Sequence, residues 1–302
     1  MRVAVSGSTG FIGTLLVPSL AAAGHQITRL IRRPQRVAEP TLLWNPESSH
    51  WDVTPLQGIE AVIHLAGESI ADGRWTRSRK DRIRESRARG TRILCEALAR
   101  LPSPPQTFVS ASAIGYYGDR GDEVLTEESG PGTGFLAEVC QGWEAATGPA
   151  IERGIRVVSL RIGVILSPEG GALAKMLPVF RLGLGGWLGS GRQYMSWVAL
   201  DDVIRAIHHV LDAESLRGPV NVVSPHPVTN REFTKILGRT LGRPALMPVP
   251  AVALRLLLGE LADEALLASA RILPSKLSAS GYPFALPDLE GALRRLLLRE
   301  QR

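Results

Sequence analysis

Cysteine is nearly absent from this chain: Cys95 and Cys140 are the only two in 302 residues. They stand far apart, and neither belongs to a spacing typical of a zinc site or a disulfide framework. The adjacent His208 and His209 have no carboxylate or cysteine companions, so we expect no metal site. Such a chain is typical of a reducing compartment.

Long apolar runs are also missing. The run from Leu254 to Leu261 is interrupted by Arg255, Gly259 and Glu260, whereas a helix that spans a bilayer needs about 20 apolar residues. The chain enters a strand pattern at once, without the charged and apolar regions of a secretion signal. We therefore expect a cytoplasmic protein with no membrane partner.

Lysine is scarce, since only four of the 35 basic side chains are lysines and the formal net charge is +6. The densest basic segment runs from Arg74 to Arg92, and a nucleic-acid surface is one interpretation of it. However, Ile83, Leu94 and Leu98 give the segment an apolar side, and no nucleic-acid motif accompanies it. We expect a solvated helix face that borders an anionic cofactor and no nucleic-acid partner; RNA binding is the alternative.

Strand and helix patterns alternate through the first half of the chain. Strand patterns cover residues 3–5, 26–31, 61–65, 107–110 and 156–160, and helix patterns cover residues 11–23, 76–100 and 135–153. This alternation is typical of parallel strands joined by right-handed helical crossovers. It predicts an α/β fold with a doubly wound parallel sheet and helices on both faces.

The pattern is looser beyond residue 166, where glycine and proline become frequent. Helix patterns remain at residues 201–211, 230–241 and 289–298. We predict a first domain over residues 1–165, with contributions to its sheet up to about residue 225. A smaller substrate-side lobe is expected over residues 166–302.

A glycine-rich turn, Gly7-Ser8-Thr9-Gly10-Phe11-Ile12-Gly13, joins the first strand to the first helix. The first glycine suits a tight turn, the second lets the main chain approach a pyrophosphate, and the third allows close packing of the helix. The free N–H groups and the positive end of the helix dipole favour phosphate groups. We predict that residues 7–13 bind a dinucleotide; a turn without a ligand is the alternative.

The end of the second strand distinguishes between the two nicotinamide cofactors. An acidic residue there accepts hydrogen bonds from the ribose of NAD. Here the sequence continues from Ile31 into Arg32, Arg33 and Arg36 with no Asp or Glu. Guanidinium groups suit a 2′-phosphate, which a carboxylate would repel. The sequence therefore favours NADP(H), held by Ile31, Arg32 and Arg33; the alternative is that these arginines are plain surface charges.

The glycine spacing resembles that of the extended short-chain dehydrogenase/reductases, whose nucleotide domain has the Rossmann-type fold. His64-Leu65-Ala66-Gly67 is similar to the fourth-strand signature of that family, and residues 109–118 are similar to its catalytic-serine segment, which puts that serine at Ser112. Residues 65–70, 180–186 and 196–198 resemble the poorly characterised "epimerase family" branch more closely. The resemblance covers essentially the whole chain, including a C-terminal module of unknown function at about residues 245–298.

This resemblance implies an NADP(H)-binding protein related to nucleotide-sugar epimerases and dehydratases. It implies that the cofactor also contacts Leu65, Ala66 and Gly67. It makes Arg82 and Arg87, on the following helix, candidates for the polar edge of the cofactor. A plain surface role for both arginines is the alternative.

The catalytic pair of the family is missing. In that family a tyrosine moves a proton to or from the substrate, and a lysine four residues later lowers the pKa of the tyrosine. Here the corresponding positions hold Leu136 and Cys140, and no Tyr-x-x-x-Lys occurs anywhere in the sequence. Tyr116 and Tyr117 are the nearest candidate acids, assisted by Glu68, Lys80 or Glu138. Lining the pocket without a chemical role is the alternative for both.

Two functions are therefore open. The first is an NADP(H)-dependent oxidoreductase or epimerase-like enzyme, in which Ser112 bonds a small-molecule substrate and Tyr117 or Tyr116 acts as the acid. The second is an NADP(H)-binding sensor or regulatory protein with little or no catalysis. The sequence does not decide the substrate or the oligomeric state.

Overall fold

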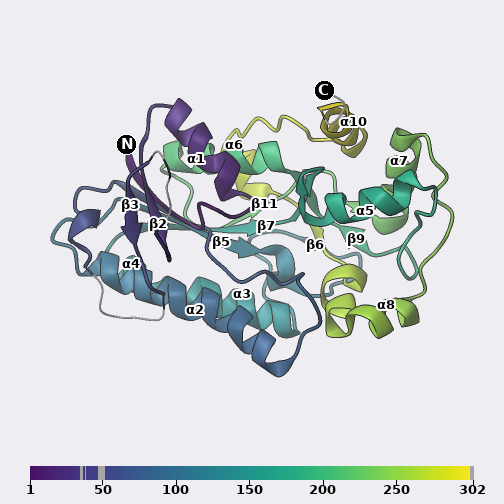
Figure 1. The fold of residues 1–302 in the computed structure, drawn as a ribbon, viewed down its shortest axis with the longest axis horizontal. Coiled ribbons are helices and arrows are strands. Elements are labelled where there is room, and N and C mark those ends of the chain that lie inside the picture. Colours follow the sequence, from purple (N-terminus) through teal and green to yellow (C-terminus); the bar gives the residue numbers. More distant parts are fainter. Residues whose placement is uncertain (35–36, 38, 47–51, 300–302) are drawn as a thin grey trace.

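The computed structural model describes residues 1–34, 37, 39–46 and 52–299, and its centre is a parallel seven-stranded sheet (Figure 1). Its strand order is β11-β7-β5-β4-β1-β2-β3. The chain adds strands outward from β1 on one side and then outward from β4 on the other, while β1 and β4 themselves are parallel neighbours. This order confirms the doubly wound topology. Ligands bind such sheets at the carboxyl ends of the strands, beside the point where the strand order reverses. The strands are β1 (Arg2–Ser6), β2 (Gln26–Ile31), β3 (Thr41–Leu43), β4 (Ala61–His64), β5 (Thr107–Ala113), β7 (Arg156–Ile162) and β11 (Gly218–Val222).

Helices cover both faces of this sheet (Figure 1). On one face lie α2 (Arg77–Ala99), α3 (Phe135–Ala145) and α4 (Gly148–Glu152), and on the other lie α1 (Gly13–Ala22) and α6 (Leu200–Asp212). Leu94 and Leu98 of α2 pack with Phe108 of β5 in one core, and Leu16 packs with Ile207 in the other. The apolar stripes that predicted these helices thus face the sheet.

Two predicted helix boundaries are wrong. The segment at residues 135–153 forms two helices, α3 and α4, because Pro149 has no N–H and its ring would clash with the carbonyl of Ala145 in a continuous helix. The first helix begins at Gly13, because Gly10 N donates to Gly7 O at 2.9 Å and closes a turn before it.

The second half of the chain forms its own apolar cluster, to which Leu173, Trp197, Phe233 and Leu293 belong. Its helices are α5 (Gly171–Arg181), α7 (Asn230–Leu241), α8 (Ala251–Leu258), α9 (Ser275–Ala279) and α10 (Leu289–Arg299), with a π-helical turn at Ala262–Leu267. Short strand pairs join β8 (Val164–Ser167) to β10 (Trp197–Ala199) and β9 (Tyr194–Met195) to β12 (Val228–Thr229). None of the described helices is long and apolar enough to cross a membrane.

The last quarter of the chain is attached to earlier segments at two places. β13 (Arg271–Ile272) pairs in parallel with β6 (Val124–Leu125). The buried Asp202 carboxylate accepts hydrogen bonds from the Tyr282 hydroxyl at 3.0 Å and from the Leu286 backbone N–H at 2.9 Å. β11, which belongs to the second half of the chain, is an edge strand of the main sheet. These contacts bring C-terminal residues to the carboxyl edge of the sheet.

Candidate functional site

A cavity of about 670 Å³ lies at the carboxyl ends of β1, β2 and β4. The glycine-rich turn, the end of β2, the loop after β3 and the segment after β4 form its walls. Its lining includes the predicted cofactor residues Gly7, Ser8, Thr9, Gly10, Ile31, Arg32, Arg33, Leu65, Ala66 and Gly67. Arg36 lies outside the described residues. The fold thus gathers three separate predicted segments around one cavity.

The turn requires glycine because of its backbone angles and because it has no space for a Cβ. Gly7 has φ +68°, and a Cβ on it would lie 2.7 Å from the carbonyl carbon of Leu65. A Cβ on Gly13 would overlap the Gly7 carbonyl oxygen. The main chain of the turn therefore packs directly on the segment after β4, which leaves the exposed Thr9 and Gly10 at the cavity.

Two buried donors in this cavity have no hydrogen-bond partner within the described part of the chain. Ser8 Oγ and Trp44 Nε1 are both buried and unpaired, although their residues line the cavity. Burying a donor without a partner costs about 1–3 kcal/mol, and a bound dinucleotide would offer phosphate and ribose oxygens as acceptors. Together with the arginines after β2, these donors fit the predicted cofactor.

The remaining predicted cofactor residues lie around the cavity, but they are not part of its lining. Phe11 packs against Gly170 and Gly171, Ile12 packs on the core, and Gly13 is buried at the start of α1. Arg82 Nη1 donates to Ser78 Oγ at 3.1 Å, and its Nε lies 3.7 Å from the Glu68 carboxylate.

Six further residues of the lining were not predicted to contact the cofactor: Leu30, Trp44, Asn45, Pro46, Glu68 and Ser86. Trp44, Asn45 and Pro46 follow β3, a three-residue strand too short to be recognised from its pattern. Ser86 Oγ accepts from the backbone N–H of Glu68 at 3.0 Å, a long-range contact that no local motif indicates.

His64 lies in the wall behind this cavity. It is completely buried between Trp44 and Phe108, its Nδ1 is hydrogen-bonded to Ser6 Oγ at 2.6 Å, and its Nε2 has no partner. Burial lowers the pKa of His64 to about 4, from an ordinary value of 6.5. The imidazole is therefore neutral at pH 7 and carries no charge toward the cofactor site.

A second cavity, of about 320 Å³, lies between α3, the end of β5 and the C-terminal segment. Arg87 separates the two cavities. It lines the second, its Nη1 donates to the Glu68 carbonyl at 2.9 Å, and a Cβ on Gly67 would lie 3.3 Å from its Cζ. Burial lowers the pKa of Arg87 below its ordinary value. Of the two predicted arginines, only Arg87 belongs to the lining of either cavity.

Neutral side chains without acid or base chemistry at pH 7 occupy the expected tyrosine and lysine positions in the second cavity. Leu136 and Cys140 of α3 line it, as the predicted tyrosine and lysine positions should, and Ala113 at the end of β5 lines it beside them. Burial raises the pKa of the Cys140 thiol to about 11, so the thiol is neutral at pH 7. Tyr194 contributes a phenol to the lining.

Ser112 does not face this cavity, contrary to the prediction. It is 3% exposed, and its Oγ donates to Glu144 Oε1 at 2.7 Å. Successive side chains of a strand point to opposite faces, so the neighbouring Ala113 takes the cavity side. The serine belongs to a buried network instead.

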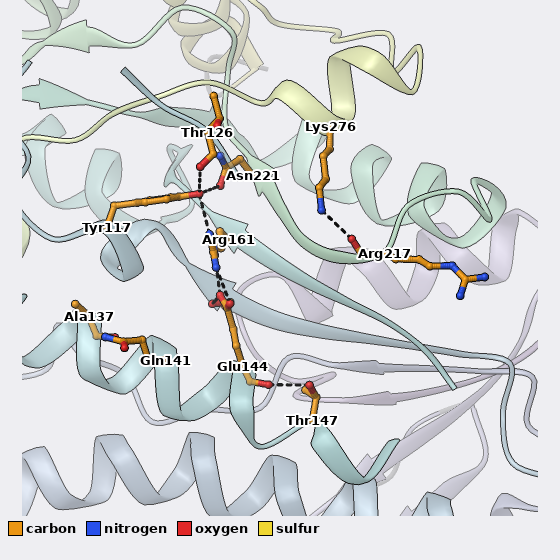
Figure 2. A network of polar contacts seen from close by, with 11 residues as sticks. Tyr117, Thr126, Ala137, Gln141, Glu144, Thr147, Arg161, Arg217, Asn221 and Lys276 are labelled. Atoms are coloured by element: carbon orange, nitrogen blue, oxygen red, sulfur yellow. Dashed lines mark hydrogen bonds and ion pairs between the residues drawn. The ribbon is translucent and has the colours of Figure 1, made fainter. Parts of the chain in front are cut away.

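The network around Glu144 also contains Tyr117 (Figure 2). Arg161 donates to both carboxylate oxygens of Glu144 at 2.8 Å and to the Tyr117 hydroxyl at 3.0 Å. That hydroxyl donates to Asn221 Oδ1 at 2.7 Å, and burial raises its pKa above the ordinary value. Tyr117 is completely buried and has its partners within the protein, so the structure does not place it as the acid.

Tyr116 and the three proposed assisting groups are likewise outside the lining of the second cavity. Arg161 lies 3.4 Å above the ring of Tyr116, which packs edge-to-face on Tyr117. Lys80 is paired with Glu260 at 2.7 Å, Glu138 lies near Arg84, and Glu68 lines the first cavity.

The C-terminal segment completes the second cavity. Glu264 lines it, and the carboxylate accepts from the backbone N–H groups of Phe135 and Leu136 at 3.0 Å each. A carboxylate suits this helix N-terminus, whose first N–H groups lack partners within the helix. The same contact requires Gly134, since a Cβ there would overlap the Glu264 carboxylate.

The glycine stretch at residues 185–191 is paired along its length. Gly189 N donates to Val249 O, and Val249 N donates to Trp187 O, both at 2.9 Å. Leu188 lines the cavity, and its N–H donates to the buried Asn230 Oδ1 at 2.7 Å. The stretch therefore forms a fixed part of the wall.

Comparisons with known proteins agree with this geometry. The model of the NAD dependent epimerase/dehydratase family matches residues 3–223. The chain belongs to this family. A domain of unknown function (DUF1731) matches residues 249–296, close to the predicted C-terminal module. An epimerase family protein of Mycobacterium tuberculosis is 46% identical over 282 residues, which are 93% of each chain. The predicted relationship to epimerase family proteins is thereby confirmed.

Two solved relatives share the fold. The crystal structure of human epimerase family protein SDR39U1 with NADPH has a TM-score of 0.89, with 34% identity over 98% of this chain and 99% of that one. A nucleoside-diphosphate sugar epimerase from Corynebacterium glutamicum has a TM-score of 0.81 and 36% identity, over 98% of this chain and 58% of that one. The NADPH of the human protein agrees with the predicted cofactor.

Replacing Gly7 tests the cofactor turn. We expect Gly7→Ala to weaken NADPH binding at least about tenfold, because the new Cβ would push the turn away from Leu65. Gly24→Ala is the matched control, since Gly24 has φ +83° but open space around it. Titration of both variants with NADPH, followed by nucleotide fluorescence, measures the effect. Equal affinities in the two variants would contradict this role for Gly7.

The buried His64 predicts an acid-sensitive fold. Between pH 6.5 and 4 the unfolded imidazole takes up a proton that the folded one does not, so stability is lost as the pH falls. The loss is about 2 kcal/mol at pH 5 relative to pH 7. Urea unfolding at both pH values should show a smaller loss in His64→Phe than in the wild type. An identical loss in both proteins would assign the effect to other groups.

Proposed function

We propose that this protein binds NADP(H) in the first cavity and transfers hydride between it and a small molecule in the second. The observation that carries the proposal is the adjacency of the two cavities across Gly67, Glu68 and Arg87. The human relative, solved with NADPH, supports the choice of cofactor. When bound, this cofactor supplies a hydride for an electrophilic carbon, and the product oxygen then takes a proton. A cytoplasmic location is part of the proposal.

The residues of the first cavity have distinct roles in this proposal. The Gly7 turn brings backbone N–H groups and Ser8 Oγ to the pyrophosphate. The exposed Arg32 and Arg33 bind the 2′-phosphate. Arg87 holds the segment from Gly67 to Glu68 through its bond to the Glu68 carbonyl, and so fixes the boundary between the cofactor and the ligand.

The residues of the second cavity exclude water and position the substrate. Leu136, Cys140 and Ala113 supply no proton at pH 7, because two are hydrocarbons and the pKa of the thiol is about 11. Tyr194 is half-buried, and it is the phenol in the lining of this cavity. We infer that Tyr194, or water, gives the proton in place of the family's tyrosine.

A second candidate function is an NADP(H)-binding sensor or regulatory protein. It is favoured by Leu136 and Cys140, since the expected tyrosine and lysine positions hold residues without acid or base chemistry at pH 7. Such a protein would bind the cofactor through the first cavity and transmit the presence of a ligand without turnover.

The cofactor preference depends on Arg32. We expect Arg32→Ala to weaken NADPH binding about tenfold and leave NADH binding within twofold, because only NADPH carries the 2′-phosphate. Arg239→Ala, an exposed arginine on α7, controls for the loss of one positive charge. Isothermal titration with both nucleotides measures the ratio. An unchanged NADPH to NADH ratio in Arg32→Ala would refute the assignment.

Hydride transfer is measured with NADPH deuterated at the nicotinamide C4 and a panel of carbonyl compounds and nucleotide sugars. We expect deuterium in the product, and turnover within threefold of wild type in the double variant Ser112→Ala, Tyr117→Phe, because neither hydroxyl lines the cavity. Loss of a true acid costs about 10²- to 10⁴-fold. A fall of that size in a folded double variant would show that at least one of these two hydroxyl groups takes part in catalysis. Tight NADPH binding without transfer favours the sensor.

A further inference from the structure

We propose that the second cavity binds a neutral, mainly apolar carbonyl compound and not a nucleotide sugar. This inference rests on the proposed function, because it names the ligand that lies beside the cofactor. Three features of the cavity carry it: an apolar wall, charged groups that are already paired within the protein, and a buried donor that has no partner.

Hydrocarbon and thioether side chains form most of the wall. They come from several elements, and they include Ile70, Leu136, Val139, Ile162, Met176 and Leu188. Leu136, Val139 and Ile162 are buried, whereas Met176 is half-buried. A wall of this kind favours apolar surface by about 25 cal/mol per Å² removed from water. The hydroxyl groups of a sugar would lose their water on entry. Of the polar side chains in the lining, Ser196 and Asn230 already form hydrogen bonds within the protein, which leaves mainly Tyr194 to replace that water.

The charged groups at the cavity are already occupied. Arg87 and Glu264 are the charged residues of its lining. Arg87 donates to the carbonyls of Glu68 and Ile83 and stacks 4.9 Å above the ring of Trp143, and Glu264 accepts two backbone N–H groups of α3. A diphosphate in this cavity would need a second cation, and the lining holds none. The wall therefore lacks the charge that would compensate a nucleoside diphosphate.

One buried donor at the cavity has no acceptor. Trp143 is 5% exposed and lines the cavity, yet its Nε1 has no hydrogen-bond partner among the residues that the structure describes. The indole N–H can only donate, so its complement is an acceptor oxygen on a neutral ligand. A carbonyl supplies such an oxygen and also the electrophilic carbon that hydride transfer requires. The volume of about 320 Å³ lies at the low end of the range for small-molecule cavities.

Binding to the full chain saturated with NADP⁺ tests the proposal, because the oxidised cofactor allows no reduction of the probe. The probes are 1-tetralone, its hydrocarbon counterpart tetralin, and UDP-glucose, each titrated calorimetrically. We expect 1-tetralone to bind at least about tenfold more tightly than UDP-glucose. Tetralin should bind about fivefold more weakly than 1-tetralone, since it cannot accept the hydrogen bond.

Two substitutions on α5 locate the binding. Met176→Glu puts a carboxylate at the cavity and should weaken 1-tetralone binding at least about tenfold. Val179→Glu lies on the exposed side of the same helix and should leave it within twofold. The NADP⁺ affinity of both variants reports that they are folded. Trp143→Phe keeps an aromatic ring and should reduce 1-tetralone binding to the level of tetralin.

UDP-glucose binding as tight as that of 1-tetralone would overturn the proposal, and so would unchanged 1-tetralone affinity in Met176→Glu with NADP⁺ bound. An unchanged preference for 1-tetralone over tetralin in Trp143→Phe would overturn the assignment of the donor. These results are distinct from failure of the proposed function, which would appear as absence of NADP⁺ binding in the wild type or of hydride transfer to any carbonyl substrate.

Discussion

The ion pair between Glu144 and Arg161 determines how the middle of this molecule is arranged. Both side chains are largely buried, and removing one partner of such a pair leaves an uncompensated charge. Burial alone would lower the pKa of Arg161, but the hydrogen bonds and charge of Glu144 outweigh it, and the net pKa is raised. The pair joins α3 to β7 of the sheet (Figure 2). Leu136 and Cys140, on preceding turns of α3, line the second cavity.

The sequence predicted the cofactor side well because its signals are local. Gly7, Gly10 and Arg32 lie within short motifs whose spacing follows from one strand, one turn and one helix. Trp44 and Ser86 were missed because a three-residue strand and a long-range hydrogen bond bring them to the cavity. Glu264 was missed for the same reason, since it lies 128 positions after Leu136 in the chain.

The sequence assigned Ser112 to the second cavity, whereas the next residue, Ala113, lines it. The sequence identified the correct strand, but the alternation of side chains along a strand sends Ser112 to Glu144 and Ala113 to the cavity. Tyr117 failed differently: its partners Asn221 and Arg161 come from strands far along the chain. Leu136 and Cys140, located by counting along the helix, both line the second cavity. The lining of the first cavity and the expected tyrosine and lysine positions thus lie on separate segments, and this chain has the family's glycine-rich turn without its Tyr-x-x-x-Lys pair.

The contact between Glu264 and the start of α3 has a consequence for biosynthesis. The ribosome synthesises residues 1–223, which contain the whole central sheet, before it adds residue 264. Until then the N–H groups of Phe135 and Leu136 lack their carboxylate, and one wall of the second cavity is missing. The whole lining of the first cavity, from Gly7 to Ser86, is therefore synthesised long before the lining of the second cavity is complete.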